Sequence, residues 1–274
     1  MKRIYDWDAN FQHRNYTVAD LKACKGHKQL TQTTANTAEE ASAARDAGLD
    51  LIMGNAVNTA LVREGAPDMF FTGAIPLPDY PTETDILNAA FAAMKAGADS
   101  IYTARGPHIV EMLAKEEIPV MCHLGLVPRR STWKGGLRAI GRDADEAIAL
   151  LQTFKDMENA GAFSVEAEVI IAEVMTQISK RTSLLTSSLG SGSGGDIIYL
   201  FQNDICGEQP ESPRHAEAFG NIYALQDEIK KERRRALKAF HDAAQSGRFP
   251  NANTTAFMDP AELEKFLERL DRQD

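Results

Sequence analysis

Short apolar runs alternate along the chain with longer stretches in which apolar positions are spaced three and four residues apart. Short runs of this kind are typical of buried strands, and the three-to-four spacing is typical of helices that bury one face. The pattern predicts strands over residues 29–34, 51–54, 69–75, 100–103, 120–125, 163–169, 183–189 and 197–202.

Helices are predicted between these strands, over residues 37–47, 82–96, 143–160 and 172–179. The first two open with a threonine that is followed three residues later by Glu40 or Asp85, the spacing of a capping box. Three of the helices end in Ala-Gly, and glycine stops a helix because it accepts a positive φ without a Cβ clash. Repeated strand–helix units build a parallel sheet.

The predicted fold class is α/β, a (β/α)8 TIM barrel with extra C-terminal helices, because eight such strands can close into a barrel. An open doubly wound sheet is the alternative that strand counting leaves. Residues 214–246 and 259–272 predict two helices beyond the last strand. We therefore expect a single barrel domain over residues 1–274, with residues 214–274 as terminal helices at the subunit interface of a homo-oligomer.

Charge and composition narrow the class of partner. The 274 residues include 30 Lys and Arg against 39 Asp and Glu, a net charge of −9, so we expect no binding to nucleic acid or anionic membrane. The basic run 230–235 could contact nucleic acid, but a solvated helix face or a subunit contact is favoured. Three scattered cysteines, no 18-residue apolar run and no secretory signal favour a cytoplasmic protein. Without G-x-G-x-x-G we expect no NAD, and we expect no haem.

His123 is the first candidate for chemistry. It lies at the end of the apolar run in PVMCHLGLVP, ahead of a loop that contains glycine. Residues at the C-terminal ends of barrel strands form the active sites of this fold. The imidazole could donate to a substrate carboxylate or ketone there, or it could be a core histidine bonded to a backbone carbonyl.

Glu166 and Glu168 are the second candidates. They are two residues apart in FSVEAEV, so they project from the same face of the predicted strand. Two such carboxylates must be paired, protonated or metal-bound, and their proximity would raise one pKa toward the range of a catalytic base. A salt bridge to Arg or Lys on a neighbouring strand is the alternative.

Other candidates bind rather than react. The Gly/Ser loop 187–196, with Ser188 and Gly190, could offer amides to a phosphate or carboxylate, or could be a plain flexible loop. Arg105 could clamp a carboxylate with two hydrogen bonds. The remaining polar positions at strand ends are Asn55 and Tyr102.

Residues 119–207 resemble ketopantoate hydroxymethyltransferase, a family of (β/α)8 barrels in the phosphoenolpyruvate mutase/isocitrate lyase superfamily. The resemblance rests on PVMCHLGLVPRRS, on GGLRAIGR, on the helix DADEAIALLQTFKDMENAGA and on the strand that ends at Glu168. It implies an oligomeric enzyme that deprotonates a 2-oxo acid beside its ketone and adds the enolate to the one-carbon unit of methylenetetrahydrofolate. It also implies that Glu168 transfers the proton, that His123 binds substrate, and that Mg²⁺ on carboxylates chelates the 2-oxo acid.

The metal-binding part of the family's pattern is missing. Its Gly-Asp-Ser reads Gly54-Asn55-Ala56, its next aspartate aligns near Ala74, and its Lys-x-Glu reads Tyr102-Thr103-Ala104. Mg²⁺ is usually bound through at least one carboxylate, so Asn55 alone is a weak ligand. Arg105, Arg129 and the amides around Gly190 could stabilise a substrate anion instead.

The sequence thus predicts a ketopantoate hydroxymethyltransferase-like enzyme that forms or cleaves a C–C bond next to the carbonyl of a small 2-oxo acid. Glu168 would be the general acid/base, and His123 would bind substrate, with Gly54, Asn55, Tyr102, Arg105, Arg129, Ser188 and Gly190 as further substrate-binding candidates. Two alternatives stay open. One is a metal-independent lyase, hydrolase or decarboxylase that uses Glu166 together with Glu168, and the other is a non-catalytic metabolite-binding barrel.

Overall fold

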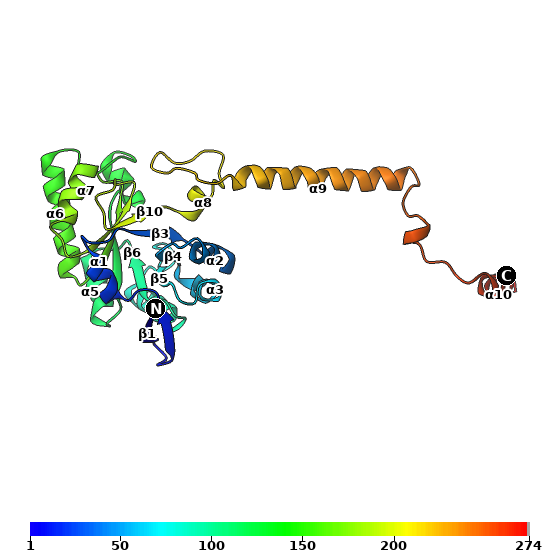
Figure 1. Ribbon diagram of the computed structural model, residues 1–274, viewed down its shortest axis with the longest axis horizontal. Helices are drawn as coiled ribbons and strands as arrows, with labels where there is room; N and C mark the ends of the chain where they lie inside the picture. Colours follow the sequence, from blue (N-terminus) through cyan, green and yellow to red (C-terminus); the bar gives the residue numbers. More distant parts are fainter. Residues whose placement is uncertain (273–274) are drawn as a thin grey trace. The chain divides into compact units, whose positions relative to one another are not determined.

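Eight parallel strands close into a barrel in the computed structural model, which describes residues 1–272. Neighbouring strands follow the order β10-β3-β4-β5-β6-β7-β8-β9 (Figure 1). The strands are β3 (Leu30–Thr34), β4 (Leu51–Asn55), β5 (Phe70–Ala74), β6 (Ser100–Thr103), β7 (Val120–Gly125), β8 (Ser164–Glu168), β9 (Leu185–Leu189) and β10 (Ile197–Tyr199). The predicted (β/α)8 barrel is confirmed, and the open sheet is excluded because β10 pairs with β3.

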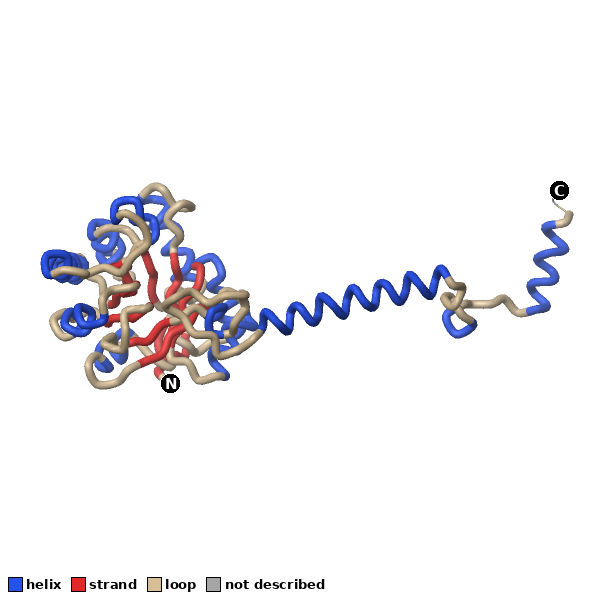
Figure 2. Tube along the Cα trace, turned by 90° about the horizontal axis from the view of Figure 1, so that it is seen from above, coloured by secondary structure: helices blue, strands red, loops and turns tan. Residues whose placement is uncertain are grey.

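Helices surround the strands (Figure 2). They are α2 (Ala38–Asp46), α3 (Thr59–Gly65), α4 (Glu83–Lys95), α5 (Pro107–Lys115), α6 (Ala144–Asn159), α7 (Ala172–Ser179) and α8 (Gln202–Ile205). Thr82 and Asp85 form the predicted capping box of α4. At α2, the Thr37 side chain accepts from the Glu40 amide, as in a capping box. The Glu40 carboxylate, however, accepts from the Asn36 amide and not from the Thr37 amide, so the box is incomplete. The sequence analysis did not predict α3 and α5.

The barrel interior changes from apolar to polar along its axis. Leu30, Leu51, Phe70, Phe163, Leu185 and Ile197 form one buried cluster near the N-terminal ends of the strands. Toward the C-terminal ends, inward positions carry Gln32, Tyr102, His123 and two glutamates. Since the N-terminal half of the interior is filled with apolar side chains, the ionisable side chains inside the barrel gather at the C-terminal end.

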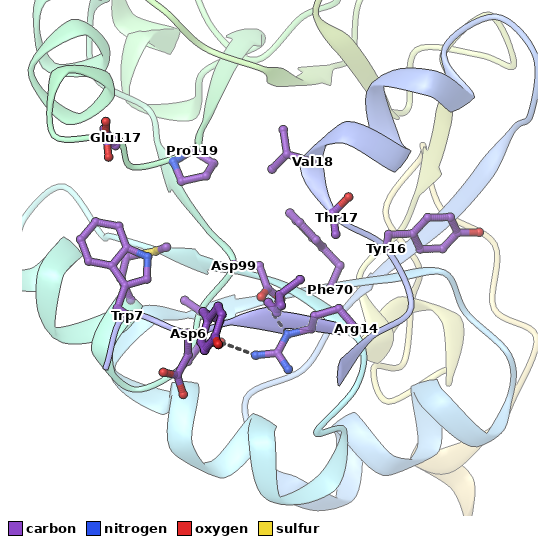
Figure 3. Close-up of a pocket in the computed structure, with 15 residues that line it drawn as sticks. Asp6, Trp7, Arg14, Tyr16, Thr17, Val18, Phe70, Asp99, Glu117 and Pro119 are labelled. Atoms are coloured by element: carbon purple, nitrogen blue, oxygen red, sulfur yellow. Dashed lines mark hydrogen bonds and ion pairs between the residues drawn. The ribbon is translucent and has the colours of Figure 1, made fainter. Parts of the chain in front are cut away.

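A hairpin precedes the barrel, formed by β1 (Lys2–Tyr5) and β2 (Phe11–Arg14), and α1 (Val18–Cys24) follows it. The hydrophobic pattern did not predict this hairpin. Arg14 Nε donates to Asp99 Oδ1 at 2.8 Å, and Arg63 Nη2 lies 2.6 Å from Asp99 Oδ2. Figure 3 shows Arg14 and Asp99 in a pocket beside Phe70 and Pro119, which lie at the starts of β5 and β7. This pocket is therefore at the opposite end of the barrel from the polar side chains.

A second compact unit begins at Asn221 and contains α9 (Ile222–Gln245) and α10 (Pro260–Leu270). The predicted helix over residues 214–246 is wrong at its start. The amides of Phe219 and Gly220 donate to the Ile205 carbonyl at 2.8 and 3.1 Å, which holds this segment against the barrel until α9 begins.

The basic run 230–235 lies within α9, where acids of the same helix pair with it. Lys231 Nζ is 2.8 Å from Asp227, and Arg235 Nη2 is 2.6 Å from Glu232, with all four side chains exposed. A subunit contact through residues 214–274 stays a prediction. Within residues 1–272, every helix is too short or too polar to cross a lipid bilayer.

Candidate active site

Three ionisable side chains meet where β7 and β8 end. His123 pairs in register with Glu166, and Gly125 pairs with Glu168, so both glutamates lie beside the histidine. His123 Nε2 is 2.9 Å from Glu168 Oε2 and 3.5 Å from Glu166 Oε1. The side chains of His123 and Glu166 are 4% and 5% exposed, whereas Glu168 is 14% exposed. Glu168 is thus the carboxylate nearest the barrel mouth.

Tyr102 joins this cluster from β6. Its hydroxyl oxygen lies 2.7 Å from His123 Nδ1 and 3.3 Å from Glu166 Oε1. Burial raises the pKa of Tyr102 well above its ordinary value, and the negative charge of Glu166 raises it further. The hydroxyl therefore keeps its proton at neutral pH and acts as a hydrogen-bond donor.

Glu166 has the most perturbed carboxyl group of the cluster. Burial raises its pKa to about 7, with His123 opposing the shift and the charge of Glu168 adding to it. A buried carboxyl of this kind is partly protonated near neutral pH, which is how acid–base sites are tuned. The two glutamates, two residues apart in sequence, thus occupy different environments.

His123 Nε2 is buried and has no aligned hydrogen-bond partner, although it is close to both carboxylates. Two further buried polar atoms on the inner wall also lack a partner, Gln32 Nε2 and Tyr199 Oη. The sequence analysis did not single out Gln32 or Tyr199. In the sequence, these two residues could have been found as polar side chains at inward positions of the first and last barrel strands. Gln32 and Tyr199 pair in register.

A cation could be held by the cluster itself. His123, Glu166 and Glu168 each offer a ligand atom, and these atoms lie within 4.8 Å of one another. One imidazole and two carboxylates suit divalent transition metals.

The positions that carry Mg²⁺ in the resemblance do not fit a metal. Asn55 and Ala74 stand at two of the family's carboxylate positions and lie in register on β4 and β5, and Ala104, which follows β6, stands at the third, so this row has no carboxylate. The Asn55 side chain accepts from the Val57 amide at 3.2 Å, capping a short 3-10 turn over Ala56–Asn58. Mg²⁺ needs oxygen ligands with at least one carboxylate in most protein sites, and this row offers none.

Two predicted arginines lie around the end of β6. Arg105 Nη2 donates to the carbonyls of Leu77 at 3.1 Å and Tyr80 at 2.7 Å, and Arg129 donates to the Ala104 carbonyl. Burial lowers the pKa of Arg129, and so do the charges of Arg130 and Arg105. Positive charge therefore collects at this edge of the mouth.

The remaining predicted substrate-binding residues have local roles. Ser188 Oγ donates to the Gly192 carbonyl at 2.6 Å, so its side chain is directed into the 190–196 loop. Gly190 has a φ of +66°, and a Cβ there would lie 2.7 Å from His215. A Cβ at Gly54 would lie 1.9 Å from the Ala35 carbonyl oxygen, which explains the glycine by close packing. The structure does not bring Gly54 or Ser188 to the cluster.

Comparison with known proteins gives the family of this barrel. The sequence pattern of ketopantoate hydroxymethyltransferase matches residues 52–252. The chain belongs to the ketopantoate hydroxymethyltransferase family. Its 3-methyl-2-oxobutanoate hydroxymethyltransferase relative from Thermotoga maritima is 31% identical over 259 residues, covering 85% of this chain and 93% of that one. The relative of the same name from Haloarcula marismortui is 31% identical over 261 residues, covering 85% and 94%.

Solved structures share the fold of this family member at low sequence identity. Phosphonopyruvate hydrolase superposes with a TM-score of 0.52 at 11% identity, covering 94% of this chain and 97% of that one. The 2,3-dimethylmalate lyase of the PEP mutase/isocitrate lyase superfamily gives 0.51 at 12% identity, covering 93% and 98%. The family resemblance seen in the sequence is confirmed, and so is the prediction of an enzyme related to hydroxymethyltransferases and lyases.

Proposed function

We propose that this protein forms or cleaves a C–C bond next to the ketone of a small 2-oxo acid, with Glu168 as general acid/base and His123 as substrate binder. The observation that carries the proposal is the 2.9 Å approach of His123 Nε2 to Glu168 Oε2 at the C-terminal end of β7 and β8. Catalytic groups of this fold lie at that end. The relatives' name, 3-methyl-2-oxobutanoate hydroxymethyltransferase, supports a branched 2-oxo acid as substrate and a one-carbon group as its partner.

Proton removal is the first step. The Glu168 carboxylate takes the proton from the carbon beside the ketone, and the electron pair of that C–H bond becomes the enolate. His123 faces the same space and can donate Nε2–H to the enolate oxygen, because no other acceptor is aligned with it. Arg105 and Arg129 supply positive charge at the mouth for the substrate carboxylate.

Bond formation is the second step. The enolate carbon attacks the carbon of formaldehyde, which water releases from methylenetetrahydrofolate, the family's donor. The π pair of the formaldehyde C=O bond becomes an alkoxide, which takes the proton from Glu168, and the new C–C bond forms as the enolate returns to a ketone. In the reverse direction the C–C bond breaks, and Glu168 returns the proton. Proton transfer of this kind contributes about 10² to 10⁴ in rate.

The mechanism does not use Mg²⁺, because Asn55, Ala74 and Ala104 offer that ion no carboxylate. Phosphonopyruvate hydrolase has been solved with oxalate and Mg²⁺, which shows that ion in a barrel of this fold. A cation on His123, Glu166 and Glu168 would occupy the carboxylate that the mechanism needs as a base. The two uses of Glu168 therefore exclude one another, and metal analysis separates them.

Deuterium exchange tests the base directly. We expect the protein in D₂O to exchange the C3 proton of 3-methyl-2-oxobutanoate, followed by loss of its ¹H NMR signal. Glu168→Gln keeps the shape of the side chain and should slow exchange about 10² to 10⁴-fold. Glu173→Gln, an exposed position in the first turn of α7, is the matched control and should exchange at the wild-type rate. Wild-type exchange by Glu168→Gln would reject the assignment.

A metal-independent lyase is the second candidate, favoured by the buried Glu166 beside Glu168. Burial holds the pKa of Glu166 at about 7, so this pair can supply one acid and one base. Such an enzyme would release a carbonyl product from a 2-oxo acid without a folate donor. Product release that continues in EDTA and needs both glutamates would favour it over one-carbon transfer.

A further inference from the structure

Tyr102 occupies a position from which it can set the protonation of His123. Its hydroxyl oxygen is 2.7 Å from Nδ1 and 3.3 Å from Glu166 Oε1. The three groups come from adjacent strands β6, β7 and β8, with His123 and Glu166 buried and Tyr102 partly buried. The shorter of the two distances is to the histidine, so the hydrogen bond to Nδ1 is the stronger one.

A neutral His123 ring allows two arrangements. A tyrosine hydroxyl donates one hydrogen bond. If it donates to Glu166, Nδ1 must carry a proton, and Nε2 then presents a lone pair 2.9 Å from Glu168 Oε2. A lone pair that close to a carboxylate oxygen in a buried site is repelled by it. If it donates to Nδ1, Nε2 carries the proton and faces Glu168 as a donor, which removes the repulsion.

We propose that Tyr102 is a positioning residue that holds His123 in its neutral Nε2–H tautomer, so that this N–H stabilises the enolate oxygen where a metal does so in other family members. The inference rests on the proposed function. It goes beyond it by naming the group that takes over the metal's role and the residue that orients it.

The geometry around Nε2 supports this role. The N–H lies between two carboxylates, 2.9 and 3.5 Å away, yet it is aligned with neither. A donor that is buried and without an aligned partner is costly, and a substrate oxygen would satisfy it. Tyr102 also lies in register with Ala74 on β5, near which the family's pattern has an aspartate. The tyrosine itself stands where that pattern has a lysine, so it and the missing metal ligands are neighbouring changes in the barrel wall.

Tyr102→Phe tests the inference, and Tyr16→Phe is its matched control. The Tyr16 hydroxyl also makes a hydrogen bond, to Asp50 Oδ1 at 2.9 Å, but Tyr16 lines the pocket at the N-terminal end of the barrel. Tyr102→Phe should lower kcat for deuterium exchange about 10 to 100-fold, the loss seen when the group that orients a metal-bound histidine is removed. KM should change less than about twofold, because the substrate-binding groups remain. Tyr16→Phe should match wild type in both.

Long-range ¹H–¹⁵N NMR of the histidine rings shows which ring nitrogen carries the proton and does not depend on enzyme activity. Wild type should show His123 with an unprotonated Nδ1 and a protonated Nε2, and Tyr102→Phe should show a mixture. This spectrum needs only wild-type protein if the variant does not fold. A wild-type His123 protonated at Nδ1, or an unchanged kcat in Tyr102→Phe, would overturn the inference.

Two further outcomes distinguish a failure of the proposed function from a failure of the inference about Tyr102. If wild type exchanges no proton of a 2-oxo acid yet shows the Nε2–H tautomer, the proposed function fails and the tautomer assignment stands. If elemental analysis finds one metal ion per chain that is lost in His123→Gln, Nε2 is a metal ligand and the inference is rejected.

Discussion

The pKa of Glu166 departs strongly from the ordinary value of a glutamate. Sequence spacing places Glu166 and Glu168 on one face but says nothing of depth. In the structure Glu166 lies one layer deeper and is 5% exposed, whereas Glu168 is at the rim with 14% exposed. Because water reaches Glu168 and not Glu166, the deeper carboxyl is the one whose pKa rises to about 7.

This shift predicts a pH dependence of stability. The unfolded chain ionises Glu166 near 4.5 and the folded protein near 7, so between these values the folded state binds the extra proton. The free energy of unfolding should therefore fall as pH rises from about 4.5 to 7, and this contribution should be absent above pH 7. Urea denaturation of wild type and Glu166→Gln between pH 4.5 and 8 measures it. A wild-type slope that Glu166→Gln does not reduce would contradict the prediction.

At the scale of elements, the packing of α2 against α3 depends on a glycine, which has no side chain. Gly65 ends α3, and a Cβ there would lie 2.0 Å from the carbonyl oxygen of Ala38 in the first turn of α2. The hydrophobic pattern predicted α2 but not α3. The reason is that α3 is short and its last residue is chosen by a neighbouring helix rather than by helix propensity.

Gly65→Ala separates the effect of helix propensity from the effect of packing against α2. Propensity alone would favour alanine by about 1 kcal/mol in a helix. The overlap with the Ala38 backbone should outweigh this, and we expect the variant to lose about 3 kcal/mol. Gly106→Ala is the control, since a Cβ there meets nothing within 4 Å, and it should lose about 1 kcal/mol or less. Equal unfolding free energies for the two variants in urea would disprove the packing argument.

For the barrel unit as a whole, a buried ion cluster joins the N-terminal hairpin to the barrel. Asp99 follows α4, Arg14 lies beside it on β2 (Figure 3), and Arg63 lies on α3, so one carboxylate connects three distant segments. Their side chains are 8%, 3% and 13% exposed. Asp99 also accepts from the Phe71 amide at the start of β5. The barrel's N-terminal end is therefore closed by polar contacts as well as by apolar packing.

Asp99→Asn should destabilise the protein by about 3 to 5 kcal/mol, because it leaves two buried guanidinium groups without their counter-charge. The exposed pair of Arg45 and Asp46 provides the control. Asp46→Asn should change the free energy of unfolding by about 0.5 kcal/mol or less. Thermal and urea unfolding measure both. A loss in Asp99→Asn no larger than in Asp46→Asn would show that the cluster contributes nothing to stability.

The sequence by itself determined the architecture of this protein. Its short apolar runs and capped helices predicted all eight barrel strands, because burial on both faces and helix capping are local requirements that each segment must meet. The family resemblance and the choice of Glu168 and His123 as candidate site residues were also readable, since both depend on residues near the ends of predicted strands. The hairpin escaped because its two strands are short and largely exposed.

Only the tertiary structure decided how the site is organised. Tyr102, His123 and Glu166 come from three segments, and the hydrogen bonds among them arise from strand register, which no single segment encodes. The depth difference between the two glutamates has the same origin, because exposure is set by the loops and strands that surround a residue. The inferred role of Tyr102 follows from this register: its hydroxyl meets the His123 ring only because the sheet pairs β6 with β7.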